Sequence, residues 1–147
     1  MSTAVLRETV LVRYGAVPEV ARFHIATLEH LQRDSRVIVR THRGLELGTL
    51  LQDVDESYQR VSASEDSSEV EILRTATEED LRQFNDSRTD CEAQFDRWRE
   101  RIANWKLNLE LVDLERLHDG KKLVLYVLNE RGPDCTKLAL QAAASGL

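Results

Sequence analysis

The sequence of 147 residues is poor in cysteine, in positive charge and in long apolar runs. Its two cysteines, Cys91 and Cys135, are too few for a secreted disulfide framework or a tetrahedral thiolate site. A net charge of -6 argues against a protein that coats nucleic acid non-specifically, because phosphate binding needs concentrated positive potential. No apolar stretch approaches the roughly 20 residues that cross a bilayer, and no signal-peptide pattern is present. We therefore expect a cytoplasmic protein without a membrane partner, metal or cofactor.

The first half of the chain, residues 1–75, predicts a β-rich, barrel-like module. Short apolar or alternating segments with glycine punctuation are typical of small barrels. The predicted strands cover residues 7–14, 20–25, 36–42, 45–51 and 70–74. Between residues 53 and 69 the sequence is rich in serine and acidic residues, and it cannot bury enough apolar surface to repay its ordering entropy. This segment is predicted to be a mobile loop.

The second half, residues 76–147, begins with a strong signal for a long helix. Thr77 is a typical N-cap, and the acidic residues at 78–80 place negative charge at the positive end of the helix dipole. Apolar residues then recur every three or four positions, interrupted by Arg88, which predicts a helix from Glu78 to about Trp105. The seam consists of Leu81, Phe84, Arg88, Cys91, Phe95, Trp98, Ile102 and Trp105. Such a helix is about 40 Å long.

This seam allows two interpretations. It can pack against the chain's own sheet, as most amphipathic helices do. Alternatively, its far end, with Trp98, Ile102 and Trp105, can bind a protein partner or form a homodimer, because the helix is longer than a small domain is wide. An exposed apolar stripe at these three residues would favour the second interpretation.

A β-hairpin is predicted from residues 109–116 and 122–129. If Asp119 and Gly120 form a type I′ turn, Leu114 pairs with Leu125 on a core face, together with Arg116–Leu123 and Val112–Val127. The other face is mixed and pairs Glu115 with Val124, Asp113 with Tyr126, and Leu111 with Leu128. Asp134 then starts a short helix that ends near Gly146. The order of barrel, long helix, hairpin and short helix predicts an α+β fold.

Two surfaces are candidates for function. The mixed hairpin face, with Asp113, Glu115 and Tyr126, is a candidate partner-binding surface. An alternative is that the two carboxylates act as an acid–base pair, which requires a cleft around them. On the barrel, the candidates for RNA binding are Arg36, Arg40, His42 and Arg43. No aromatic residue interleaves with these four to stack a base, so a solvated barrel rim is the competing interpretation.

Three separated blocks, in order, resemble a known family. They are residues 36–50 (RVIVRTHRGLELGTL), residues 74–81 (RTATEEDL) and residues 111–126, which contain LVDLE and DGKKLVLY. These blocks are similar to the C-terminal conserved domain of the polymerase-suppressor family, which includes the bacterial YaaT (RicT) proteins. The resemblance covers most of the chain, from about Val10 to Ala143.

The resemblance implies a non-enzymatic role in complexes that influence RNA processing and cell-development decisions. Bacterial members continue past the final helix into another strand and a cysteine-rich segment associated with an iron–sulfur cluster. The sequence here stops at Leu147, and neither Cys91 nor Cys135 matches that segment. The expectation is therefore a regulatory or scaffold protein without a cofactor.

Overall fold

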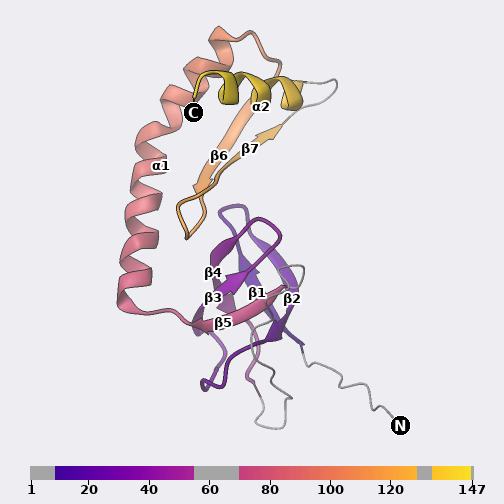
Figure 1. Cartoon of the computed structure of the whole chain (residues 1–147), viewed down its shortest axis with the longest axis vertical. Helices are drawn as coiled ribbons and strands as arrows, with labels where there is room; N and C mark the ends of the chain where they lie inside the picture. Colours follow the sequence, from indigo (N-terminus) through magenta and orange to yellow (C-terminus); the bar gives the residue numbers. More distant parts are fainter. Residues whose placement is uncertain (1–8, 55–69, 129–133, 147) are drawn as a thin grey trace, which may run out of the picture.

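The structure is a computed structural model that describes residues 9–54, 70–128 and 134–146. Its fold is α+β, as predicted, with a closed five-stranded barrel followed by a long helix, a hairpin and a short helix (Figure 1). The barrel strands are β1 Thr9–Tyr14, β2 Glu19–Ile25, β3 Arg36–Arg40, β4 Leu45–Leu50 and β5 Glu71–Thr75. The loop predicted for residues 53–69 lies outside the described residues, apart from its first two positions.

The barrel closes because its strands follow the order β1-β2-β5-β3-β4 and β4 pairs with β1. These pairs are antiparallel except β2 with β5, which is parallel. Strands β1 and β4 approach closely at Gly48, where a Cβ atom would lie 2.6 Å from Cγ1 of Val12. Buried apolar side chains fill the interior: Val10, Val12, Phe23, Ile25, Leu31, Val37, Val39, Leu50, Val54 and Ile72.

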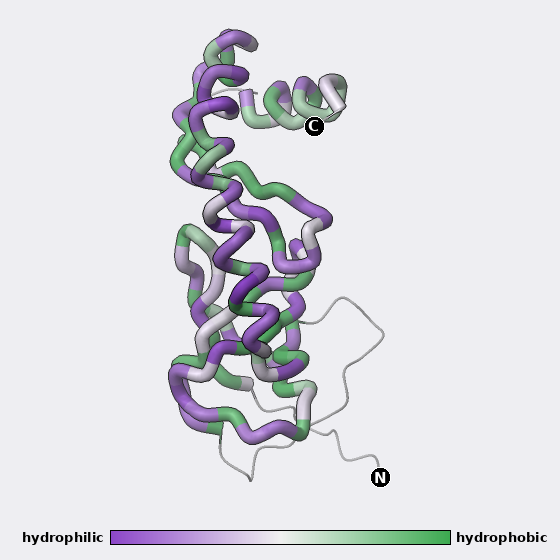
Figure 2. Tube along the Cα trace, turned by 90° about the vertical axis from the view of Figure 1, so that its left-hand side faces the viewer, coloured by the Kyte–Doolittle hydropathy of each residue, from purple (hydrophilic) through white to green (hydrophobic). Residues whose placement is uncertain are grey.

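Helix α1, Glu78–Asn104, leaves the barrel and runs beside the hairpin (Figure 1). The Thr77 hydroxyl accepts the backbone N–H of Asp80, and the Asp80 carboxylate accepts the backbone N–H of Thr77. This capping box satisfies two backbone donors that the helix itself leaves without partners, and it confirms the predicted start. Seen from its outer side in Figure 2, α1 is mainly hydrophilic with hydrophobic residues at intervals. No helix in the described ranges is long and apolar enough to span a membrane.

The hairpin strands are β6 Glu110–Arg116 and β7 Leu123–Leu128, and helix α2 is Asp134–Ala144. A second hydrophobic core forms where α1 and α2 pack on one face of this hairpin. Its buried members are Cys91, Trp98, Ile102, Leu111, Leu114 and Leu138. Helix α2 crosses the end of the hairpin farthest from the barrel (Figure 1). The apolar seam of α1 therefore faces the chain's own hairpin.

The hairpin register agrees with the prediction only near the turn. The four cross-strand pairs nearest the turn are those predicted. Between Leu111 and Asp113 the ladder shifts, and Leu111 lies opposite Val127. The predicted pairings of Val112 with Val127 and of Leu111 with Leu128 are therefore wrong. The irregularity is consistent with a β-bulge, which places Leu111 in the core and leaves Val112 46% exposed.

The turn also differs from the predicted type I′. Gly120 has a φ of 74°, but Asp119 is not among the non-glycine residues with positive φ. The backbone N–H of Gly120 donates to the carbonyl of Leu117 at 2.8 Å, so the left-handed conformation is confined to the glycine. The N–H of Leu117 donates to the carbonyl of Lys122 at 3.0 Å. This bond maintains the predicted pairing beside the turn.

Candidate functional site

Two polar clusters join the barrel to the hairpin, and the first is centred on Arg43, between β3 and β4. Its Nη2 lies 2.7 Å from Oε1 of Glu46 and 3.7 Å from Oε1 of Glu115 on β6. Its Nη1 donates to the hydroxyl of Tyr126 on β7 at 2.9 Å. The guanidinium also lies 5.9 Å from the ring centroids of Tyr14 and Tyr126. One barrel cation therefore contacts groups on both hairpin strands.

Glu115 completes this cluster from the hairpin side. Its buried carboxylate accepts the backbone N–H of Ala16 at 2.9 Å and the hydroxyl of Tyr126 at 2.6 Å. Burial, and then the hydrogen bond to Glu115, raise the pKa of Tyr126 to about 12. Burial, and then the hydrogen bond to Glu19, raise the pKa of Tyr14 to about 12. Both tyrosines are therefore neutral at physiological pH, where they can donate to carboxylates.

The second cluster is centred on Asp80, in the first turn of α1. Arg74 donates from Nη2 to Oδ1 of Asp80 at 2.9 Å, and Nε2 of His118 lies 2.8 Å from the same oxygen. The hydrogen bond from Arg74 is the main reason that the pKa of Asp80 lies well below its usual range. The backbone N–H of His118 donates to the carbonyl of Leu45 at 2.9 Å. This cluster links the barrel strands β4 and β5 to the start of α1 and to the hairpin turn.

The carboxylates predicted as a surface or an acid–base pair lie in different surroundings. Asp113 has a side chain 30% exposed, accepts the backbone N–H of Leu114 and lies 3.6 Å from Nη2 of Arg88. Glu115 instead faces the barrel together with Tyr126. Arg88, which interrupts the α1 seam, also donates to the carbonyl of Leu114 at 3.0 Å. Near the turn, the mixed hairpin face is therefore occupied by the chain's own barrel.

The structure separates the basic residues predicted as a nucleic-acid site: Arg36, Arg40, His42 and Arg43. Arg36 is exposed, with its guanidinium 5.7 Å from the ring centroid of Phe84 on α1. Arg40 lies 3.9 Å from the fully buried carboxylate of Glu71. Arg43 belongs to the first polar cluster, whereas His42 is exposed. Two of the four side chains are thus engaged with buried carboxylates.

The aromatic end of α1 follows the first interpretation of the seam. Trp98 is 3% exposed and Ile102 is 4% exposed, and both belong to the second core. Trp105 is half-buried against the same core. These residues do not form the exposed apolar stripe that would favour a homodimer through the helix.

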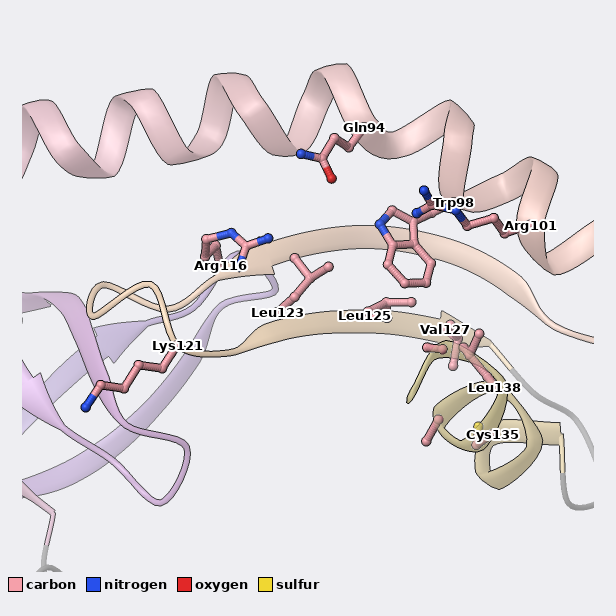
Figure 3. Close-up of a pocket in the computed structure, with 12 residues that line it drawn as sticks. Gln94, Trp98, Arg101, Arg116, Lys121, Leu123, Leu125, Val127, Cys135 and Leu138 are labelled. Carbon is pink, nitrogen blue, oxygen red and sulfur yellow. The ribbon is translucent and has the colours of Figure 1, made fainter. Parts of the chain in front are cut away.

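A pocket of about 610 Å³ lies between α1, the hairpin and α2 (Figure 3). Alternate β7 side chains, Leu123, Leu125 and Val127, form its apolar floor, and each is half-buried. The remaining lining residues are Gln94, Trp98 and Arg101 on α1, Arg116 and Lys121 beside the turn, and Cys135, Leu138, Ala139 and Ala142 on α2. Two of its cations, Arg116 and Lys121, thus lie at the turn end, whereas Arg101 lies on α1 toward the more apolar α2 end (Figure 3).

Two features of the pocket were not predicted from the sequence. Its twelve described lining residues include three cations and no carboxylate. The Nε1 atom of Trp98 is buried and has no hydrogen-bond partner. Trp98 was predicted as a seam residue, but the pocket forms only where α2 and β7 come together, which no local pattern specifies. No group of three or more His, Cys, Asp or Glu side chains suited to a metal ion occurs in the part of the chain described.

Comparison with known proteins places this pocket within a recognised region. Residues 70–142 match the family described as the PSP1 C-terminal conserved region, and all pocket-lining residues fall in that range. The chain is also 26% identical over 118 residues to the Stage 0 sporulation protein YaaT of Bacillus subtilis (strain 168). That similarity covers 78% of this chain and 41% of YaaT, so the chain spans about two fifths of this relative's length. No solved structure gave a significant match.

Proposed function

The chain belongs to the PSP1 family, and from this premise we propose that it is a non-enzymatic regulatory or scaffold protein that binds a protein partner. The observation that carries the proposal is the open pocket on the hairpin within the PSP1 region. Its half-buried apolar floor is a feature typical of interaction sites.

The two polar clusters support this proposal by giving the pocket a fixed frame. Arg43 and Asp80 connect the barrel to the hairpin through buried or half-buried contacts. Separating the barrel from the hairpin would break these hydrogen bonds. Such a separation is unfavourable, because a buried polar group that loses its partner before water reaches it is left unsatisfied. The barrel therefore serves as a support for the PSP1 region.

A link to RNA processing is the finer part of the proposal and rests on the resemblance to YaaT-like proteins. The competing function is direct RNA binding by the barrel. Arg36 and His42 are its best remaining contacts because both side chains are exposed. Substituting Arg40 or Arg43 would test it poorly, since each arginine lies beside a buried carboxylate and its loss would also affect the fold.

The experiment is affinity capture of the full chain from its native cell, with and without ribonuclease, followed by binding measurements with the purified partner. We expect one protein partner that is retained after ribonuclease and that binds the purified chain directly. The double variant Arg36→Glu, His42→Ala should bind that partner like the wild type. Loss of every partner after ribonuclease, together with salt-sensitive RNA binding that this variant abolishes, would contradict the proposal.

A further inference from the structure

We propose that the pocket between α1, β7 and α2 binds an extended segment of a partner protein that presents apolar side chains and a carboxylate. The inference rests on the proposed function and specifies the chemistry of the partner. The charge of the pocket favours a carboxylate: Arg101, Arg116 and Lys121 line it, whereas none of its described lining residues is acidic. An anionic group would therefore gain favourable contacts there, and a cationic group would be repelled.

The indole of Trp98 favours the same kind of ligand. Trp98 is only 3% exposed, and its Nε1 has no hydrogen-bond partner. Figure 3 shows the indole nitrogen on the side of the ring that faces Gln94 and Arg116. A buried N–H without an acceptor is unfavourable, and a carboxylate or carbonyl oxygen from a ligand would satisfy it. The pocket thus contains a donor suited to the same ligand that its cations favour.

The backbone of β7 favours an extended ligand. Among the described strands, β7 pairs only with β6. The hydrogen bond from the N–H of Leu117 to the carbonyl of Lys122 shows that the backbone carbonyl of Lys122 points toward the first strand of the hairpin. Because this direction alternates from residue to residue along an antiparallel strand, the backbone groups of Leu123, Leu125 and Val127 are expected to point to the outer edge. An edge strand of this kind can pair with an added peptide strand. Since the same three residues provide the pocket floor, a peptide at this edge could bind both backbone and pocket.

The pocket also has a direction that the ligand should match. Arg116 and Lys121 lie beside the turn, whereas the opposite end has Val127, Leu138 and Ala142 with Arg101 as its single lining cation. The ligand carboxylate should therefore lie toward the turn, with its apolar side chains toward α2. A peptide with alternating side chains places both kinds of group on one face.

The test uses immobilised synthetic hexapeptides in which three threonines alternate with two leucines and one glutamate. The glutamate stands at either end of the peptide, and a control set replaces it with lysine. Binding of the full 147-residue chain is measured by surface plasmon resonance. We expect one of the glutamate peptides to bind at least about tenfold more tightly than its lysine counterpart at low salt, and this preference should shrink with added salt.

Matched variants assign any binding to the pocket. Lys121→Glu should weaken binding of the glutamate peptide by roughly five- to tenfold, whereas Lys122→Glu should leave it within about twofold. Both lysines are exposed, but only Lys121 lines the pocket. A second pair, Ala139→Trp and Leu140→Trp, tests the volume of the pocket without changing charge. Ala139 lines the pocket and Leu140 is exposed outside its lining, so only the first variant should block the peptide.

Equal binding of the glutamate and lysine peptides, or equal effects within each pair of variants, would overturn the inference. The outcome can be separated from that of the proposed function. If a ribonuclease-resistant partner binds Lys121→Glu and Ala139→Trp as tightly as the wild type, partner binding stands and this pocket is not its site.

Discussion

The two faces of the β6–β7 hairpin differ in how completely their polar and apolar groups are engaged. On the face toward the barrel, Glu115 and Tyr126 contact Arg43, and the buried carboxylate accepts two hydrogen bonds. On the face toward α1 and α2, three apolar side chains are half-buried and the indole of Trp98 has no acceptor. The first face therefore joins the hairpin to the barrel, and the second face, which also carries the second core, is the one that we propose binds a partner.

The largest expected effect comes from breaking the first face at Arg43. Arg43→Ala leaves the buried carboxylates of Glu46 and Glu115 without their cation, and should lower the free energy of unfolding by about 3 kcal/mol. Chemical denaturation measures this loss. Arg82→Ala is the control, because Arg82 pairs with Glu79 on the exposed surface and its loss should cost less than about 0.5 kcal/mol. Equal stability of the two variants would show that the contacts of Arg43 do not stabilise the junction between the barrel and the hairpin.

The second prediction concerns Asp80. Asp80→Ala removes half of the capping box and the acceptor for Arg74 and His118, and should cost about 2 kcal/mol at pH 7. The pKa of Asp80 is lowered in the folded state, so its stabilisation is present above the unfolded-state pKa and is lost as the pH falls. The difference between wild type and variant should therefore shrink below about pH 4. A difference that stays constant from pH 6 to pH 3 would contradict this origin.

The third prediction concerns Tyr126 at alkaline pH. Its pKa is about 12 in the folded state, above the ordinary value of 10.0, so the associated stability is present below pH 10.0 and is lost toward pH 12. Tyr126→Phe should cost about 1 kcal/mol near pH 7 and should reduce the loss of stability above pH 10. Urea denaturation at several pH values measures both effects. Wild type and variant with identical alkaline profiles would disprove the coupling.

The smallest expected effect is on the hairpin face toward α1 and α2. Lys121→Glu and Lys122→Glu should each change the free energy of unfolding by less than about 0.5 kcal/mol, because both side chains are exposed. Thermal denaturation checks this expectation. If Lys121→Glu were strongly destabilising, the pocket rim would be structural, and the contrast between the two faces would weaken.

The fold could be predicted from the sequence because its signals are local. Thr77 with the acidic residues after it marks the start of α1, and the Asp119-Gly120 pair marks the hairpin turn. The bulge near Val112 could not be predicted, since the segment Leu-Val-Asp-Leu satisfies two registers and only packing selects one.

The candidate sites were less predictable because they combine residues far apart in the sequence. Arg43 was predicted as a nucleic-acid contact and Glu115 as part of a partner-binding surface. In the structure, Nη2 of Arg43 lies 3.7 Å from Oε1 of Glu115. The hydrogen-bonding contact of His118 with Asp80 joins residues 38 positions apart, and no local spacing indicates it. Patterns in one segment show which face a side chain takes, but they do not show which segment faces it.

The most direct test of peptide binding in the pocket uses the two tryptophan indole signals in a ¹⁵N–¹H correlation spectrum of the 147-residue chain. Trp98 lines the pocket and has a buried, unpartnered Nε1, whereas Trp105 packs beside the core without lining the pocket. Titration with the glutamate hexapeptide should shift the Trp98 indole signal and leave that of Trp105 nearly unchanged. The lysine peptide should shift neither signal. A Trp98 signal that does not move at saturating glutamate peptide, or that moves equally with both peptides, would contradict the account.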